Sequence, residues 1–306
     1  MGVWRHLRFL DNLLLLTSHA LSYSILTSFL EGIVMKAIFR SICSGAFLLL
    51  LSGCASTANN NFNSLLWMQS SAEYKAGAIQ TYSSALRQID IALGDRKWTA
   101  APEQVGDCSS LPPAIVMDID ETVLDNSRYM GKVVLEGGAW SSVTWAEWVA
   151  LKEATAVPGA VEFINAMKDK NVRVVFISNR ECSKRDNPGS GCSQEAATIE
   201  NLAKVGVADV LPENMLLMGE ADGWTSEKKS RREYVSKKYR IVMLFGDDLG
   251  DFLADVKSSI TPQERDRLVE ENKNNWGRKW FVLPNPTYGS WLNILRDPKS
   301  QYILKY

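Results

Sequence analysis

Residues 114–127 read AIVMDIDETVLDNS, an apolar run of four residues followed by two aspartates spaced two positions apart. Pro112 and Pro113 precede the run, and a short apolar run bounded by a turn signal predicts a buried β-strand. Because Asp118 and Asp120 follow at once, we expect their carboxylates beyond the apolar sheet, where open α/β sheets bind ligands. The stretch therefore predicts the first strand of an α/β fold and the beginning of a site.

More short apolar runs follow, and longer amphipathic segments separate them. Buried strands that alternate with helices are typical of a parallel sheet with helices on both faces, so the predicted fold class is α/β. The expected strands after the first cover residues 172–177, 214–218, 241–245 and 279–283, and the expected helices cover residues 159–170, 194–205, 228–239 and 262–273.

Two further segments are expected to form a small, mainly helical cap. Apolar residues with helical spacing predict a helix over residues 65–93. The Gly- and Trp-rich segment 129–157 interrupts the alternation between the first strand and its helix. We therefore assign the cap to residues 65–100 and 129–157, within one domain over residues 65–306.

Polar residues directly follow most of the predicted strands. Besides Asp118 and Asp120, these are Ser178-Asn179-Arg180, Gly246-Asp247-Asp248 and Asn285. The carboxyl ends of parallel strands lie at one edge of the sheet, so these residues are expected to converge although they are far apart in sequence.

The carboxylates at these strand ends predict a divalent cation. Asp247, Asp248 and Asp251 add negative charge beside Asp118 and Asp120, and carboxylates that close repel one another unless a cation neutralises them. Ligands that are all oxygen, with no His or Cys, favour one Mg²⁺ over zinc. A carboxylate can also attack phosphorus to form an aspartyl-phosphate, while a second one exchanges protons. The cluster is therefore a candidate centre for phosphoryl transfer.

Composition narrows the chemistry further. The net charge of −1 and the pI near 6.2 argue against a protein that binds nucleic acid through bulk positive charge. The chain has 2 histidines, His6 and His19, and both precede the targeting segment. If that segment is removed, Ser-His-Asp and Cys-His mechanisms, histidine nucleophiles and zinc sites with His ligands are excluded. General acid–base catalysis would then have to use carboxylates, Lys, Tyr or Cys.

The targeting segment, residues 35–60, reads MKAIFRSICSGAFLLLLSGCASTANN. Lys36 and Arg40 precede a short apolar stretch, and Leu51-Ser52-Gly53-Cys54 resembles the lipobox of bacterial lipoprotein signals. This order predicts a signal peptide over residues 35–53, a lipidated Cys54 and a polar tether over residues 54–64.

Residues 1–34 do not fit that scheme, because they place another apolar stretch ahead of a complete signal. We interpret them as an upstream extension, with translation starting at Met35. The alternative is an N-terminal membrane helix over residues 13–30, which its polar residues weaken. Ala55 resembles the residue that follows the lipidated cysteine in lipoproteins sorted to the outer membrane, so we expect the protein there.

Three cysteines remain after the signal, and an exported protein meets an oxidising compartment. Cys182 and Cys192 flank a loop rich in Gly, Pro and Asn, so a short disulfide between them is one prediction. Spacing alone does not decide which cysteines pair with which, and Cys108 would be left over.

The motifs together resemble the haloacid dehalogenase-like superfamily and, within it, the class C bacterial acid phosphatases with the lipoprotein e family of 5′-nucleotidases. The resemblance runs from about Leu65 to Trp291. It is carried by Leu66-Trp67-Met68-Gln69, Ser71-Ala72-Glu73-Tyr74, DIDETVLDNS from Asp118, Trp145-Ala146-Glu147-Trp148, Ala156-Val157-Pro158-Gly159-Ala160, Ser178-Asn179-Arg180, Lys228 ahead of Arg231-Arg232, GDDLGDF from Gly246, and Leu283-Pro284-Asn285 through Tyr288-Gly289.

The resemblance implies a Rossmann-like core and a role for each site residue. Asp118 would be the nucleophile and Asp120 the general acid and base. Asp118, the backbone carbonyl of Asp120 and Asp247 would hold Mg²⁺, with Asp251 acting behind these ligands. Ser178, Asn179 and Lys228 would bind the phosphoryl oxygens, although the neighbouring Lys229 leaves the choice of lysine open. Trp145 and Tyr288 would stack on a substrate base, whereas Trp148 is expected in a small core.

The expected activity is therefore Mg²⁺-dependent hydrolysis of phosphomonoesters, with nucleoside 5′-monophosphates or nicotinamide mononucleotide as substrates. Two alternatives stay open: a non-catalytic surface lipoprotein that captures nucleotides, and a phosphatase or phosphotransferase for sugar phosphates. The expected partners are the substrate and a membrane through the lipid anchor, with a homodimer left open and no nucleic acid.

Overall fold

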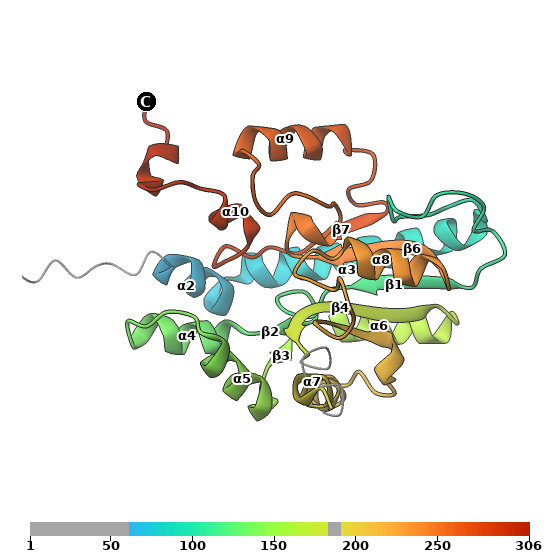
Figure 1. The fold of residues 1–306 in the computed structure, drawn as a ribbon, viewed down its shortest axis with the longest axis horizontal. Coiled ribbons are helices and arrows are strands. Elements are labelled where there is room, and N and C mark those ends of the chain that lie inside the picture. Colours follow the sequence, from blue (N-terminus) through green and yellow to red (C-terminus); the bar gives the residue numbers. More distant parts are fainter. Residues whose placement is uncertain (1–60, 183–190) are drawn as a thin grey trace, which may run out of the picture. The chain divides into compact units, whose positions relative to one another are not determined.

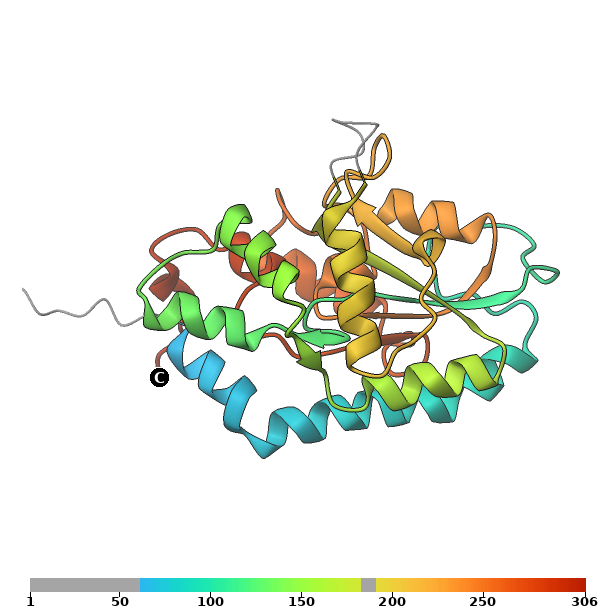
Figure 2. The same ribbon diagram turned by 90° about the horizontal axis from the view of Figure 1, so that it is seen from below.

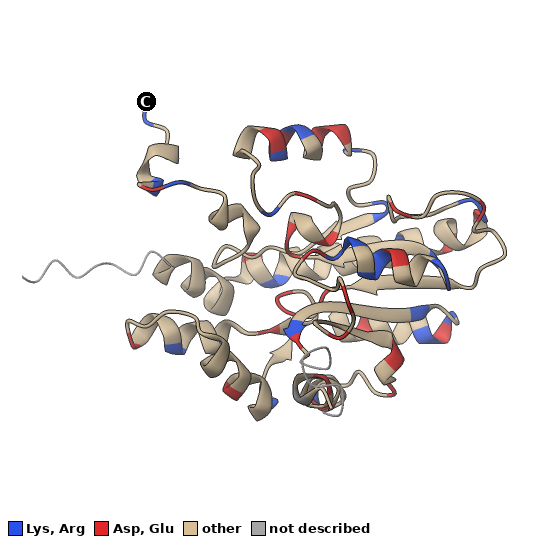
Figure 3. Ribbon diagram, in the orientation of Figure 1, with Lys and Arg blue, Asp and Glu red and all other residues tan. Residues whose placement is uncertain are grey.

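The computed structural model describes residues 61–182 and 191–306. The predicted extension over residues 1–34, the signal peptide over 35–53 and the lipidated Cys54 lie outside the described residues. Within the described part, no helix is long and apolar enough to cross a bilayer. Residues of both charge signs are interspersed along this part, and α9 carries both (Figure 3).

A five-stranded parallel sheet forms the centre of the domain (Figure 1). Its strand order is β5-β4-β1-β6-β7, and every neighbouring pair is parallel. The strand expectations are therefore confirmed, with small shifts at the ends. The bounds are β1 Pro113–Met117, β4 Arg173–Glu181, β5 Met215–Met218, β6 Arg240–Gly246 and β7 Trp280–Val282.

Side chains of β1 alternate between two hydrophobic cores. Ile115 and Met117 pack into one core, and Ala114 and Val116 pack into the other. Both faces of the strand are buried, which is why the sequence of β1 reads as a continuous apolar run.

Helices cover both faces of the sheet, as predicted. Helices α3 and α6 contact each other on one face and run side by side (Figure 2). Helix α8 contacts β4 and β6, and its residue Val235 belongs to the second core. The bounds are α3 Ala72–Gly94, α6 Ala160–Asp169, α7 Ser193–Lys204, α8 Lys229–Ser236 and α9 Pro262–Glu271.

A cap follows β1. The short antiparallel pair of β2 and β3 forms its base, and the chain between them forms α4 and α5. Helix α2 contacts α4, and α5 contacts α7. The bounds are α2 Phe62–Ser70, β2 Leu124–Asp125, α4 Ser127–Leu135, α5 Ser142–Leu151 and β3 Thr155–Ala156.

The single helix predicted over residues 65–93 is wrong, because the chain breaks at Ser71. Ser71 has an extended backbone (φ −82, ψ 139), and its side chain accepts a hydrogen bond from the backbone N–H of Tyr74 at 3.1 Å. A serine that caps a new helix in this way ends the previous one. The predicted cap segment 65–100 is thereby divided: α2 contacts the cap helix α4, whereas α3 covers the sheet. Helix α2 also begins inside the predicted tether, at Phe62.

The remaining elements are short: one directly precedes β5, one follows β6, and two lie in the C-terminal segment. They are η1 Pro212–Asn214, η2 Leu249–Asp251, α10 Ser290–Asn293 and η3 Lys299–Tyr302. A disulfide joins Cys182, just after β4, to Cys192, just before α7, and Cys108 is free and buried.

Candidate active site

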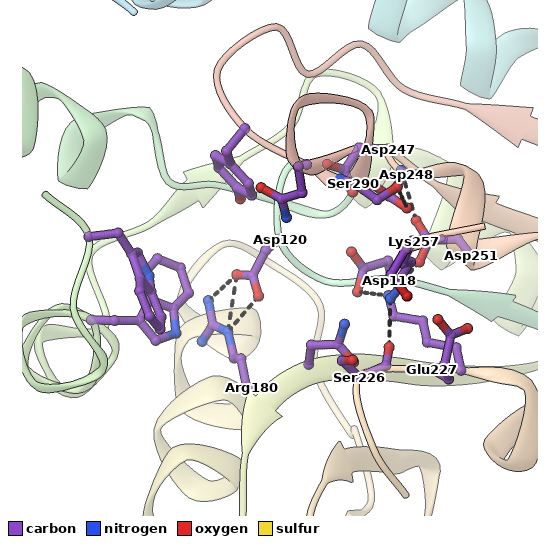
Figure 4. A pocket seen from close by; sticks show the side chains of 18 of the residues that line it. Asp118, Asp120, Arg180, Ser226, Glu227, Asp247, Asp248, Asp251, Lys257 and Ser290 are labelled. Atoms are coloured by element: carbon purple, nitrogen blue, oxygen red, sulfur yellow. Dashed lines mark hydrogen bonds and ion pairs between the residues drawn. The ribbon is translucent and has the colours of Figure 1, made fainter. Parts of the chain in front are cut away.

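A cavity of about 770 Å³ lies where the strand-end residues meet (Figure 4). Asp118 and Asp120 from the loop after β1 line it together with Asn179 from β4 and Asp247 from the loop after β6. Tyr288 and the cap residue Trp145 line it from another side. The structure thus brings together residues that lie more than a hundred positions apart, as the parallel topology requires.

Asp118 and Asp251 share one buried lysine. Lys228 Nζ lies 2.6 Å from Asp118 Oδ1 and 2.5 Å from Asp251 Oδ1. Lys228 is 4% exposed, whereas Lys229 is exposed on the first turn of α8. The structure therefore places Lys228, and not Lys229, at the site. Burial would lower the pKa of Lys228, but the charges of Asp118 and Asp251 outweigh it and raise that pKa.

The negative charge of this cluster is only partly compensated by Lys228. Burial, with added repulsion from Asp251 and Asp120, raises the pKa of Asp118 to about 6 although Lys228 opposes the shift. Burial and the charges of Asp118 and Asp251 also raise the pKa of Asp247 well above its ordinary value. One oxygen from each of Asp118, Asp247 and Asp251 lies within 4.8 Å of the other two. Three oxygen donors in a buried, negatively charged cluster fit a hard divalent cation.

Glycine is required where β6 ends. A Cβ on Gly246 would lie 2.0 Å from Asp251 Oδ2, so any side chain there would displace Asp251. Asp247 follows, and its Oδ2 accepts a hydrogen bond from Asn285 Nδ2 at 2.8 Å. Asn285, at the end of β7, thereby orients a carboxylate of the cluster.

Asp248, which the sequence groups with the acids of the cluster, is a structural cap. Its Oδ1 accepts hydrogen bonds from Gly250 N at 2.8 Å and Ser290 Oγ at 2.7 Å, and its Oδ2 accepts one from Ser290 N at 2.6 Å. These bonds outweigh the effect of burial and lower the pKa of Asp248. The carboxylate thus joins η2 to α10.

The Asp120 carboxylate pairs with an arginine, whereas Asp118 and Asp251 pair with Lys228. Arg180 Nη2 lies 2.7 Å from Asp120 Oδ1, and Arg180 is 1% exposed (Figure 4). The motif Ser178-Asn179-Arg180 does not by itself assign Arg180 a role. Residues two apart on a strand point to the same side, so the spacing of Ser178 and Arg180 indicates that both face one side of β4, but it does not identify Asp120 as the partner of Arg180.

The residues predicted to bind phosphoryl oxygens are all near the cluster, but their contacts differ. Ser178 is fully buried, and its Oγ lies 3.4 Å from Asp120 Oδ2. Asn179 lines the cavity, and its Oδ1 accepts a hydrogen bond from Arg231 Nη2 at 2.7 Å. Arg231 also donates to Ser178 O, so it supports two successive residues of β4. Burial lowers the pKa of Arg231 to about 10. The spacing of Lys228 and Arg231, three apart on one helix face, is the signal that could have found it.

Aromatic side chains form the cap side of the cavity. Trp145 and Tyr288 are partly buried and line the cavity, and Trp140 joins them. Trp145 packs edge-on against Tyr129, with ring centroids 5.1 Å apart. Trp148 is instead 8% exposed in the core, as predicted, and donates a hydrogen bond to Asn126.

Comparisons with known proteins agree with this geometry. A family model described as HAD superfamily, subfamily IIIB (acid phosphatase) matches residues 49–291. The class C acid phosphatase from Bacillus anthracis has a TM-score of 0.67 and 31% identity, covering 81% of this chain and 98% of that one. The same enzyme with tungstate bound also has a TM-score of 0.67, with 32% identity over 82% of this chain and 99% of that one.

Two proteins from Glycine max are more distant relatives. The stem 31 kDa glycoprotein is 27% identical over 178 residues, and the stem 28 kDa glycoprotein is 26% identical over 178 residues. Each match covers 56% of this chain and 58% of the plant protein, so the chain spans less than two thirds of their length. The family match covers most of this chain, and the chain therefore belongs to the acid phosphatases of HAD superfamily subfamily IIIB.

Proposed function

We propose that this protein hydrolyses phosphomonoesters by passing the phosphoryl group through the carboxylate of Asp118. The observation that carries the proposal is the position of Asp118 in the cavity, where one oxygen pairs with buried Lys228 at 2.6 Å. The lysine lies beside the attacking group and can hold the negative oxygens of the incoming phosphoryl group. The similar class C acid phosphatase from Bacillus anthracis binds tungstate, an oxyanion, which supports an oxyanion site in this protein.

The reaction has two steps. In the first, an Asp118 oxygen forms a bond to phosphorus while the bond to the leaving oxygen breaks, and Asp120 gives that oxygen a proton. In the second, Asp120 takes a proton from water, the water oxygen bonds to phosphorus, and the bond to Asp118 breaks. Lys228 stays protonated throughout, because its two carboxylate partners raise its pKa. Inorganic phosphate and an alcohol are the products.

We propose Mg²⁺ as the cation of the site. Asp118, the backbone carbonyl of Asp120 and Asp247 would hold it, and it would neutralise charge on the phosphoryl oxygens. Asp251 fits a place behind these ligands, because both of its oxygens already have partners: Oδ1 lies 2.5 Å from Lys228 Nζ, and Oδ2 accepts a hydrogen bond from Asp248 N at 3.0 Å. All of these donors are oxygen, and burial raises the pKa of the Asp118 carboxyl to about 6 without a cation.

We propose nucleoside 5′-monophosphates or nicotinamide mononucleotide as substrates. A cavity of about 770 Å³ is larger than a phosphoryl group needs, and its remaining wall carries Trp140, Trp145 and Tyr288. Aromatic rings stack on any planar base, so this wall suits a nucleotide with little discrimination between bases.

The test of the activity is phosphate release from a panel of phosphomonoesters, with Mg²⁺ and after exhaustive chelation. We expect release only with the cation, and faster release from nucleotides than from sugar phosphates. Binding of nucleotides without release would instead favour the non-catalytic lipoprotein. Faster turnover of sugar phosphates would contradict the nucleotide assignment alone.

We also propose that the protein is exported and anchored in the outer membrane by lipid on Cys54. The order of positive residues, apolar stretch and lipobox in residues 35–54 supports this. Mass spectrometry of the membrane-extracted protein should find lipidated Cys54 as the N-terminus, and Cys54→Ala should yield an unprocessed or soluble form. Residues 1–34 on the mature protein would contradict the proposal.

A further inference from the structure

The two carboxylate oxygens of Asp120 have unequal surroundings. Oδ1 accepts hydrogen bonds from Arg180 Nη2 at 2.7 Å, Arg180 Nε at 3.1 Å and Asn126 Nδ2 at 2.9 Å. Among the described residues, Oδ2 has two longer contacts, with Arg180 Nε at 3.3 Å and Ser178 Oγ at 3.4 Å. A carboxylate oxygen offers two lone pairs, so Oδ1 is fully used whereas Oδ2 keeps capacity for a proton. Asp120 lines the cavity, where a substrate would meet it.

Arg180 is held in place from two more directions. Its Nη1 donates to Thr198 Oγ1 on α7 at 2.9 Å, and its guanidinium lies 5.7 Å from the centre of the Trp145 ring. A planar guanidinium fixed by several partners sets the direction of the carboxylate it pairs with. The orientation of Asp120 therefore depends on β4, α7 and the cap.

Asn126 is fixed by a cap tryptophan. Trp148 Nε1 donates to Asn126 Oδ1 at 2.8 Å, and an indole N–H is a donor only. The oxygen of the Asn126 amide must therefore face Trp148, which directs its NH₂ group to Asp120 Oδ1. Asn126 is fully buried, so water does not compete for these bonds.

We propose that Arg180 and Asn126 are positioning residues that turn Asp120 so that Oδ2 is the oxygen that exchanges the proton, and that Trp148 acts through Asn126. In the first step the Oδ2–H bond breaks, and the leaving oxygen receives that proton as it takes the electron pair of the broken P–O bond. Helix α5 therefore acts on Asp120 through two intermediate residues. Its Trp145 packs against Arg180, and its Trp148 donates a hydrogen bond to Asn126. The inference rests on the proposed phosphatase function.

The test compares two leaving groups. An alkyl phosphate such as glycerol phosphate needs a proton on its leaving oxygen, whereas p-nitrophenyl phosphate releases a stable phenolate. We measure kcat/KM with Mg²⁺, because this constant covers departure of the leaving group and not the later attack of water. Arg180→Met should lower kcat/KM by about 100-fold for the alkyl ester and by less than about tenfold for the aryl ester.

A milder pair of variants separates positioning from general destabilisation. Trp148→Phe removes the hydrogen bond to Asn126 and keeps an aromatic ring at this position. Trp280→Phe is the matched control, since it removes a buried indole hydrogen bond, to Ala100 O at 2.7 Å, from a residue that does not line the cavity. Both should lower the melting temperature, but only Trp148→Phe should raise the ratio of aryl to alkyl kcat/KM, by several fold.

An equal loss on both esters in Arg180→Met and an unchanged ratio in Trp148→Phe would overturn the inference. If Arg180→Met does not fold, the ratio in Trp148→Phe decides alone. If the wild-type protein releases phosphate from neither ester, the proposed function itself fails, which is a different outcome from an active enzyme whose variants lose both activities alike.

Discussion

Replacing Asp118 by Asn should make the cation-free protein more stable while abolishing hydrolysis. Burial is the main cause that raises the pKa of Asp118 from 3.8 to about 6. Because the folded pKa lies above the ordinary value, the folded chain binds this proton more tightly than the unfolded chain. Ionisation at neutral pH therefore costs the folded state about 3 kcal/mol, at about 1.4 kcal/mol for each pKa unit. A neutral amide of the same shape avoids that cost.

The assay is thermal unfolding in EDTA at several pH values. At pH 7 a gain of about 3 kcal/mol corresponds to a melting temperature about 6–12 °C higher for a chain of this size. The advantage of Asp118→Asn should shrink as the pH falls below the folded pKa of about 6 and vanish near 3.8, where wild-type Asp118 is protonated in both states. Mg²⁺ should stabilise the wild type more than the variant.

Asp248→Asn is the matched control. It makes the same substitution near Asp118, but we expect the opposite change in stability. Hydrogen bonds from Gly250 and Ser290 lower the pKa of Asp248, so its charge stabilises the fold above the ordinary pKa and this stabilisation is lost as the pH falls. The variant should therefore unfold at a lower temperature at pH 7. An Asp118→Asn protein that is no more stable than the wild type in EDTA would refute the electrostatic reasoning. Retention of more than about a tenth of wild-type kcat would refute the nucleophile.

Three more outcomes are expected. Exhaustive chelation should abolish phosphate release and Mg²⁺ should restore it; full activity in a sample shown by elemental analysis to be free of metal would contradict the carboxylate site. Trp145→Ala or Tyr288→Ala should raise KM for nucleotides and leave small aliphatic phosphates nearly unchanged, whereas equal damage to both would make these rings structural. Exchanging Cys182 and Cys192 for Ser should lower the free energy of unfolding by about 3 kcal/mol, measured in urea, because the bridge closes a loop of sequence separation 10; an unchanged midpoint would contradict this.

The sheet was predictable because strands that are buried on both faces have continuous apolar sequences. Strands such as β1 and β6 are buried along almost their whole length, so they read as apolar runs with polar residues directly after them. The convergence of Asp118, Lys228 and Asp247 follows from parallel topology and chain order alone. These features can be predicted without knowing in which direction each side chain points.

Features that depend on a single side-chain contact were not predictable. The apolar spacing continues through Ser71, so nothing in the periodicity marks the bond to Tyr74 that separates α2 from α3. The pairing of Asp120 with Arg180 requires the relative placement of β1 and β4, which a sequence pattern does not supply. Asp248 looks like another acid of the cluster until its bonds to Ser290 identify it as a cap.

The arrangement of the three cysteines in the described part of the chain bears on how these residues pair during folding. Cys182 and Cys192 are separated by 10 positions, whereas Cys108 is far from both in sequence and ends up 5% exposed. Closing the short loop costs less chain entropy than closing either long one, which favours the native pairing by about an order of magnitude. Once folded, the Cys108 thiol is shielded from exchange with the bridge. The observed pairing is therefore also the one that loop closure favours in the unfolded chain.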